Sequence, residues 1–345
     1  MRVEKIVLNE ERNVTLTAYL QEVGGEFRNV TKRPAILVLP GGGYQFCSDR
    51  EADPVAMPYL KAGYQAFILR YSVKKDAQWP NPLNDYEQAM ELIRSKAEEW
   101  GLYADKVAVI GFSAGGHLAA AAATMSKNRP NAAILGYAVA GEDVKGCSKT
   151  APDTISAVSH ETCPCFLFAT RTDNVVPIAN SIRFMEALDK YDIAFESHIY
   201  SHGPHGFSTC DTSVQDRETV ISKRVPNWVG DSISWLTDVL GDFGDGKMTE
   251  PVCKAHVSDD GEAFLSVDCT FARLMGNPQA REILAPMMEK MQGQNAAAAG
   301  VEMEVTDELK AMMSKMKLRD MLAFGKAPKE VVNMLDEQLR KIPNI

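Results

Sequence analysis

Three residues of the sequence, Ser113, Asp173 and His205, have the types and the order that nucleophilic catalysis needs. A serine hydroxyl is a poor nucleophile unless a histidine takes its proton, and that histidine needs a carboxylate to fix its tautomer. Each of the three follows an apolar segment typical of a buried strand, and parallel strands bring their carboxyl ends to one edge of a sheet. We therefore predict that the three side chains meet at that edge and carry out acyl transfer through a covalent serine intermediate.

The segment around the serine, Gly111-Phe112-Ser113-Ala114-Gly115, predicts a sharp turn between a strand and a helix. The apolar residues 107–110 before it favour a buried strand, and the alanine-rich residues after it favour a closely packed helix. Small neighbours let strand and helix approach closely, so that the serine hydroxyl stands exposed above the sheet. This context predicts a nucleophile elbow.

A second glycine-rich segment predicts donors for the negative oxygen that forms during acyl transfer. Residues 34–39 read as a buried strand that ends abruptly in Pro40 and three glycines. Backbone N–H groups in such a loop can point at the same position as the N–H that follows the serine. We predict an oxyanion hole formed by the N–H groups of Gly42, Gly43 and Ala114.

Other histidines and acids are alternatives that the sequence leaves open. His202 lies three residues before His205 in the same loop, and Asp153 and Asp211 are fallback candidates for the acid. His198, His202 and His205 together could suggest a metal site. However, His198 lies within a predicted strand, and no carboxylate or thiolate near these histidines has the spacing of a metal ligand. We expect no metal and no cofactor.

Strands and helices alternate through most of the chain after an antiparallel hairpin at residues 3–23. This order predicts an α/β fold with a doubly wound, mostly parallel sheet. The predicted strands are 34–39, 65–71, 107–110, 132–140, 165–170 and 194–200, and the helices that follow or separate them include 51–62, 84–100, 178–190 and 226–243. We predict a catalytic domain over residues 1–245.

The character of the chain changes after a glycine- and aspartate-rich segment, and residues 246–345 read as a small helical appendage. Apolar residues at helical spacing predict helices over 278–292, 306–323 and 328–342. Methionine-rich stripes on such helices are typical of core or interface packing. We expect this module to pack on the catalytic domain or on a second copy, which leaves a homo-oligomer open.

Composition limits the partners and the compartment. The 345 residues carry a formal net charge of −9, which argues against nucleic acid or an anionic membrane surface as partner. No apolar run approaches the roughly 20 residues of a membrane span, and residues 1–6 lack the apolar segment of a signal peptide. The seven scattered cysteines lack the density of a disulfide scaffold. We therefore expect a cytoplasmic protein.

Four motifs together resemble the α/β-hydrolase esterases of the acetylxylan-esterase and BD-FAE (feruloyl-esterase-like) type. They are Leu39-Pro40-Gly41-Gly42-Gly43-Tyr44, Gly111 to Ala119, Asp173 to Pro177 and Gly203-Pro204-His205-Gly206-Phe207. The resemblance covers roughly residues 15–240, and it departs at Pro40, where the family often has histidine. The tail resembles a helical module appended to some bacterial carbohydrate-active enzymes.

The resemblance implies a serine carboxylesterase that removes acetyl or similar small acyl groups from carbohydrate, with acetylated xylo-oligosaccharides as the expected substrate. The expected partner is thus a small-molecule or oligosaccharide ester. Tyr44 and Trp79 are candidates for stacking on a sugar ring. The alternatives are a peptidase or lipase on the same fold, or a non-catalytic binding or assembly protein.

Overall fold

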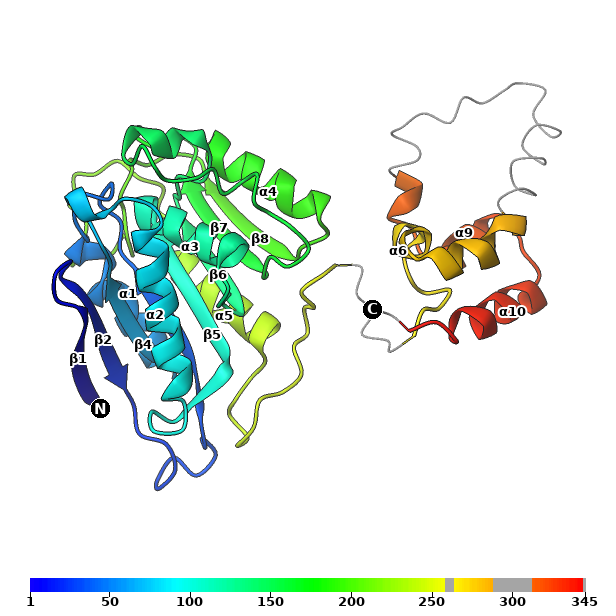
Figure 1. The fold of residues 1–345 in the computed structure, drawn as a ribbon, viewed down its shortest axis with the longest axis horizontal. Coiled ribbons are helices and arrows are strands. Elements are labelled where there is room, and N and C mark those ends of the chain that lie inside the picture. Colours follow the sequence, from blue (N-terminus) through cyan, green and yellow to red (C-terminus); the bar gives the residue numbers. More distant parts are fainter. Residues whose placement is uncertain (258–263, 288–311, 344–345) are drawn as a thin grey trace. The chain divides into compact units, whose positions relative to one another are not determined.

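An eight-stranded sheet organises the first 255 residues of the computed structural model, which describes residues 1–257, 264–287 and 312–343 (Figure 1). The strand order is β1-β2-β4-β3-β5-β6-β7-β8, and all pairs are parallel except the β1–β2 hairpin and the β2–β4 pair. The strands are β1 (Arg2–Asn9), β2 (Val14–Leu20), β3 (Arg33–Leu39), β4 (Gln65–Arg70), β5 (Leu102–Phe112), β6 (Ala132–Gly136), β7 (Cys165–Thr170) and β8 (Phe195–Tyr200). The predicted α/β class and mostly parallel sheet are confirmed.

Helices cover both faces of this sheet, and its central strands are apolar and buried over residues 35–39, 107–112 and 132–136. The helices are α1 (Asp53–Lys61), α2 (Asn81–Ser95), α3 (Ser113–Met125), α4 (Ala179–Lys190) and α5 (Asn227–Leu240), and three short 3₁₀ turns lie at Asp49–Glu51, Lys74–Asp76 and Glu142–Gly146. Side chains of α2, α3 and α4 share one apolar core with the sheet, and those of α1 and α5 share the other. The two cores hold the carboxyl ends of the parallel strands rigidly at one edge.

Several predicted elements have different bounds in the structure: β5 begins at Leu102 instead of residue 107, and α2 ends at Ser95 instead of residue 100. Helix α2 begins at Asn81 instead of residue 84, because Pro82 in its first turn has no N–H that would need a partner there. Strand β6 ends at Gly136 instead of residue 140, because the next residue, Tyr137, has a φ of 35° and turns the chain out of the sheet.

The contact between β5 and α3 depends on glycine at position 111. A Cβ atom added there would lie 2.1 Å from the carbonyl oxygen of Gly115 and 2.9 Å from Cβ of Ala119. The strand and the helix therefore approach too closely for any side chain. This close approach is what allows the turn between them to be so sharp.

Replacement of Gly111 by alanine is therefore expected to destabilise the protein by about 3 kcal/mol, through overpacking. Differential scanning calorimetry should show a fall in Tm of roughly 6–12 °C. Gly230→Ala in α5 is the matched control, because no atom lies within 4 Å of the added methyl group there. Equal melting temperatures for the two variants would contradict the close approach.

The chain divides into two units, Met1–Ala255 and His256–Ile345, ten residues later than the boundary predicted at 245/246. Residues beyond 245 stay with the sheet because their backbone bonds to it. The N–H of Ala194 donates to the carbonyl of Ala255 at 2.9 Å, and the N–H of Cys253 donates to the carbonyl of Asp238 at 2.9 Å. The composition changes near residue 245, but the packing changes only at residue 256.

The described part of the second unit is a small helical cluster with its own apolar core. It contains α6 (Phe271–Gly276), α9 (Leu318–Phe324), α10 (Lys329–Leu339) and helical residues 278–287. Helix α10 confirms the predicted helix at 328–342 apart from its ends. The predicted helix at 306–323 is interrupted, since Lys317 is extended and pairs with Thr270. Residues 288–311, which complete two of the predicted helices, lie outside the described residues.

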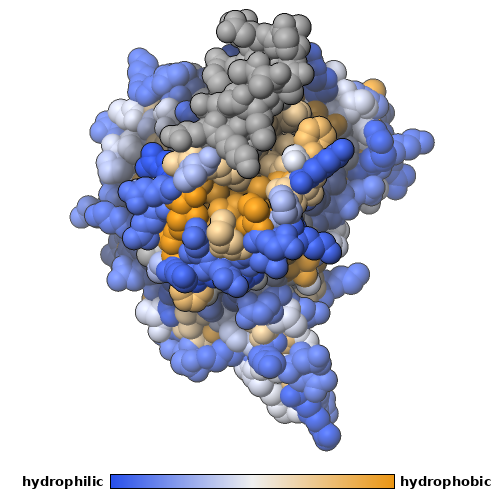
Figure 2. Space-filling view, turned by 90° about the vertical axis from the view of Figure 1, so that its right-hand side faces the viewer, coloured by the Kyte–Doolittle hydropathy of each residue, from blue (hydrophilic) through white to orange (hydrophobic). Residues whose placement is uncertain are grey.

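Apolar side chains are also exposed on this second unit, and Figure 2 shows a face of the molecule with a continuous apolar area. Among the described residues of this unit, Phe324 is the most exposed large apolar side chain, at 89%, and Met334 is 51% exposed. In the described parts of the chain, no helix combines the length and the apolar character needed to cross a bilayer.

Candidate active site

The structure brings the three predicted side chains together at the carboxyl edge of the sheet. Nε2 of His205 lies 2.9 Å from Oγ of Ser113, and Nδ1 of His205 lies 2.7 Å from Oδ2 of Asp173. Ser113 has the positive φ of 53° expected of a nucleophile at a sharp turn. These contacts are the ones that a serine nucleophile, a histidine base and an orienting carboxylate require.

The backbone holds the carboxylate of Asp173 in place. Its Oδ1 accepts the N–H groups of Val175 and Val176 at 2.8 and 2.9 Å, which leaves Oδ2 for the imidazole. The side chain is only 2% exposed, while that of His205 is 15% exposed. The acid is thus shielded from water, and the base keeps an opening towards a substrate.

The alternative base and acids lie elsewhere. His202 is exposed, and its Nδ1 bonds only the neighbouring Ser201 hydroxyl at 3.0 Å among the contacts of the described chain. Asp153 accepts the N–H of Ile155 in a local turn. Asp211 bonds the N–H and hydroxyl of Ser213, and these hydrogen bonds lower its pKa. Among the contacts of the described residues, the imidazole that lies within hydrogen-bond distance of Ser113 is that of His205, and the carboxylate that bonds His205 is that of Asp173.

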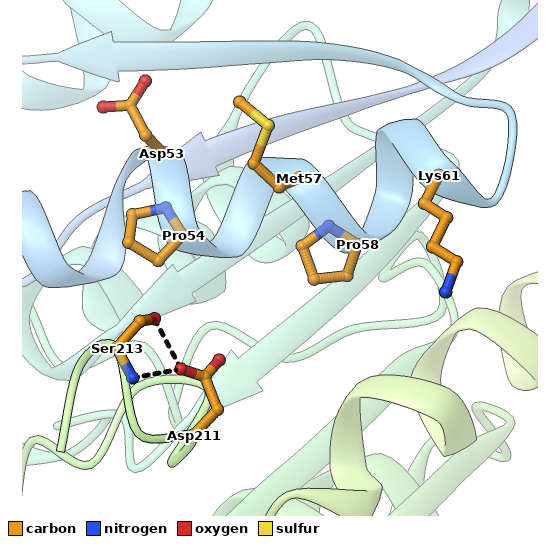
Figure 3. A pocket seen from close by; sticks show the side chains of 7 residues that line it. All are labelled: Asp53, Pro54, Met57, Pro58, Lys61, Asp211 and Ser213. Carbon is orange, nitrogen blue, oxygen red and sulfur yellow. Dashed lines mark hydrogen bonds between the residues drawn. The ribbon is translucent and has the colours of Figure 1, made fainter.

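Asp211 instead lines an open cavity of about 760 Å³ beside helix α1 (Figure 3). In that view, Pro54 and Pro58 of α1 lie on the side of the short loop that carries Asp211 and Ser213, while Asp53 and Met57 point away from it. The lining residues are Asp53, Pro54, Met57, Pro58, Lys61, Asp211 and Ser213. Ser113, Asp173 and His205 do not line this cavity. Its size therefore does not identify it as the active site.

The loop after β3 lies beside the serine, as the glycine pattern predicts. Gly42 has a φ of 130°, and a Cβ atom there would lie 2.2 Å from the carbonyl oxygen of Phe46, so only glycine fits. The N–H of Gly41 is already bonded to Oε2 of Glu51 at 2.8 Å. It is therefore occupied inside the protein, and the oxyanion role of Gly42, Gly43 and Ala114 stays a prediction.

The prediction that Tyr44 stacks on a sugar is wrong. Its side chain is 1% exposed, and its hydroxyl lies 2.7 Å from Nδ1 of His117, to which it donates. The other ring nitrogen of His117 donates to the carbonyl of Pro152 at 2.8 Å. The hydrogen bond to His117 holds the side chain of Tyr44 inside the protein. The same bond joins the glycine loop to helix α3. Trp79 is partly exposed, with its ring 5.6 Å from that of His117, and its substrate contact stays a prediction.

Burial lowers the pKa of His117 from 6.5 to about 4, which makes a testable pH dependence. Between these values the unfolded chain binds a proton that the folded protein excludes, so stability is full above pH 6.5 and falls as the pH drops towards 4. We expect His117 to contribute about 3 kcal/mol to that loss. Urea titrations from pH 7 to 4 should give a flatter profile for His117→Gln, and an unchanged one for His202→Gln. Identical profiles for His117→Gln and the parent would contradict the shift.

Sequence reasoning did not single out Glu51 and Tyr137, which lie directly beneath the serine and histidine. Both are buried, and the hydroxyl of Tyr137 donates a hydrogen bond to Oε1 of Glu51 at 2.6 Å. Glu51 precedes a helix, where an acidic residue is ordinary, and the sequence carries no signal that it is buried. Among the described residues, no group of three or more His, Cys, Asp or Glu side chains could hold a metal ion.

Comparisons with known proteins show which proteins this chain is similar to. The BD-FAE family model matches residues 27–133. The chain is 31% identical over 196 residues to an acetylxylan esterase of Xylanibacter ruminicola, covering 50% of this chain and 41% of that protein. It is 30% identical over 211 residues to endo-1,4-beta-xylanase B of Butyrivibrio fibrisolvens, covering 52% of this chain and 33% of that protein. The chain therefore spans less than half the length of these two curated relatives.

A solved structure matches over nearly its whole length. It is an α/β-hydrolase enzyme, MGS-M1, from a Medee basin deep-sea metagenome library, with 44% sequence identity and a TM-score of 0.65. The match covers 69% of this chain and 98% of that chain. Together with the sheet order and the turn at Ser113, this match shows that the chain belongs to the α/β-hydrolase family and resembles its esterases of the BD-FAE type.

Proposed function

We propose that this chain is a carboxylic ester hydrolase that works through Ser113, His205 and Asp173. The observation that carries the proposal is the continuous set of contacts from Oγ of Ser113 through the imidazole to the buried carboxylate, at 2.9 and 2.7 Å. Similarity to an acetylxylan esterase supports an ester as the substrate. A peptidase or lipase and a non-catalytic binding or assembly protein are the alternatives that the tests must exclude.

The reaction proceeds in two steps. Oγ of Ser113 attacks the ester carbonyl and its proton passes to Nε2 of His205, while the carbonyl oxygen becomes an oxyanion held by the N–H groups of Gly42, Gly43 and Ala114. The C–O bond then breaks, and the alcohol leaves with the proton from Nε2. Water attacks the acyl-enzyme in the same way, its proton passes through Nε2 to Oγ, and the acid is released.

We propose acetyl groups on carbohydrate, with acetylated xylo-oligosaccharides first, as the natural substrate class. The support is the similarity to a named acetylxylan esterase, over half of this chain. A cytoplasmic location and assembly through the C-terminal helices belong to the same proposal. The seven cysteines are scattered along the sequence without the density of a disulfide scaffold, which suits a reducing compartment.

Acetate release measured with a panel of esters tests this function. We expect acetylated xylo-oligosaccharides and p-nitrophenyl acetate to be hydrolysed with kcat/KM at least about tenfold above p-nitrophenyl palmitate, with no cleavage of peptide p-nitroanilides. Preference for the palmitate or the anilides would favour the lipase or the peptidase. No turnover and no labelling by a fluorophosphonate probe would favour the non-catalytic alternative.

A further inference from the structure

A buried carboxylate beneath the serine connects the loops that form the candidate site. Glu51 is 4% exposed and lies in the 3₁₀ turn before α1. Its Oε2 accepts the N–H of Gly41 at 2.8 Å, and its Oε1 accepts the hydroxyl of Tyr137 at 2.6 Å. Both oxygens are thus held by donors from two other segments, the glycine loop after β3 and the chain that leaves β6.

Tyr137 extends this connection to the loop that carries the histidine. Its hydroxyl oxygen accepts the N–H of Ser208 at 3.0 Å while it donates to Glu51. Its ring lies edge-on to the imidazole of His205, with 5.0 Å between the ring centroids and 70° between the planes. Trp228 in α5 also fixes this loop, through a bond from Nε1 to the carbonyl of Ser208 at 3.0 Å.

Gly41 places the carboxylate next to the nucleophile. A Cβ atom on Gly41 would lie 2.7 Å from Oε2 of Glu51 and 3.1 Å from Cβ of Ser113, so the three residues meet at one point. The next two residues, Gly42 and Gly43, are the predicted oxyanion donors. Any shift of Gly41 away from Glu51 would therefore move those donors relative to the serine.

A carboxylate in such a place is costly, because burial separates its charge from water. Burial raises the pKa of Glu51, and the hydrogen bonds from Tyr137 and Gly41 oppose that rise. The facing cationic groups are His205, when protonated, and Arg50, and both act in the same direction as the hydrogen bonds. A neutral apolar side chain would fill this space at lower cost, but it could accept neither bond.

We propose that Glu51 is a positioning residue. Through its own bond to Gly41 and through Tyr137, it fixes the glycine loop after β3 and the loop that carries His205 relative to Ser113. This inference rests on the proposed function. Oxyanion donors act mainly after the carbonyl oxygen has gained charge, so misplacing them lowers kcat more than it raises KM. A residue with a purely structural role would instead lower thermal stability without that kinetic signature.

Glu51→Gln and Tyr137→Phe test the proposal. An amide at position 51 has one acceptor oxygen for two donors, so one of the two bonds is lost, and phenylalanine at position 137 removes the hydroxyl. We expect each variant to lower kcat about 10- to 100-fold with KM within about threefold of the parent. Because both act through one chain of bonds, the double variant should be no more than about threefold slower than the slower single variant.

The matched control is Tyr59→Phe. Tyr59 is also fully buried in the same core, and its hydroxyl lies 2.8 Å from that of Ser232, away from the three loops. We expect Tyr59→Phe to lower Tm about as much as Tyr137→Phe while kcat stays within about twofold of the parent. If Glu51→Gln fails to fold, Tyr137→Phe against Tyr59→Phe decides the question.

The rate of Ser113 labelling by an aryl fluorophosphonate separates this proposal from the proposed function. Phosphonylation needs the activated serine and the oxyanion donors but no ester substrate. A parent that is labelled but hydrolyses no ester contradicts the proposed function, while labelling at least about tenfold slower in Glu51→Gln and Tyr137→Phe still supports the positioning role. Labelling within twofold of the parent in both variants, or additive effects in the double variant, would overturn it.

Discussion

Replacement of Ser113 by alanine is expected to lower kcat by a factor on the order of 10³ to 10⁶ while the fold stays intact. The change removes only the hydroxyl oxygen that lies 2.9 Å from Nε2 of His205, so no other group in the site can form the acyl-enzyme. Binding and the oxyanion donors remain, and they account for the residual rate. KM should change little because the serine oxygen contributes mainly to the transition state.

The measurement is p-nitrophenyl acetate hydrolysis together with fluorophosphonate labelling, both expected to be lost in Ser113→Ala. Ser201→Ala is the control, because Ser201 is an exposed serine whose hydroxyl contacts His202, the rejected alternative base. It should retain the parent rate and the label. A Ser113→Ala protein with a near-normal rate would exclude Ser113 as the nucleophile.

Replacement of Asp173 by asparagine is expected to lower kcat by about 10⁴, the loss seen when a catalytic histidine is held in the wrong tautomer. The backbone decides which way the new amide points. Two N–H groups, from Val175 and Val176, already face Oδ1, so the amide oxygen must take that position and the NH₂ group must face Nδ1 of His205. The imidazole then carries its proton on Nε2, directed at Ser113, where it cannot accept one.

Asp211→Asn is the matched control, since Asp211 is one of the two fallback candidates for the acid and lines the separate cavity beside α1. It should keep kcat within about twofold of the parent. Circular dichroism and Tm should show that both variants are folded. Loss of activity in Asp211→Asn but not in Asp173→Asn would reverse the assignment of the acid.

The sequence alone was enough to predict the fold class and to select Ser113, Asp173 and His205 as the candidate site, because their signals are local. Small residues around Ser113 and the apolar strand before it are typical of one kind of turn, and the alternation of strands and helices predicts a parallel sheet. Asp173 and His205 each follow the end of a strand, β7 or β8, and the carboxyl ends of parallel strands meet at one edge. Local order along the chain was therefore enough to predict that they meet.

Only the tertiary structure could decide among residues that share a local pattern. His202 and His205 lie in one loop, and the structure shows that it is His205 whose Nε2 lies 2.9 Å from Oγ of Ser113. Tyr44 reads as an exposed loop aromatic, but its hydrogen bond to His117, 73 residues away, holds it inside the protein.

The link between Glu51 and Tyr137 spans 86 residues, and the pairing of Ala194 with Ala255 moves the domain boundary. The residues next to Glu51, Tyr137, Ala194 and Ala255 in the sequence give no signal that predicts either contact. Burial and partnership depend on which distant segments the fold brings together, and the local pattern of a sequence does not carry that information.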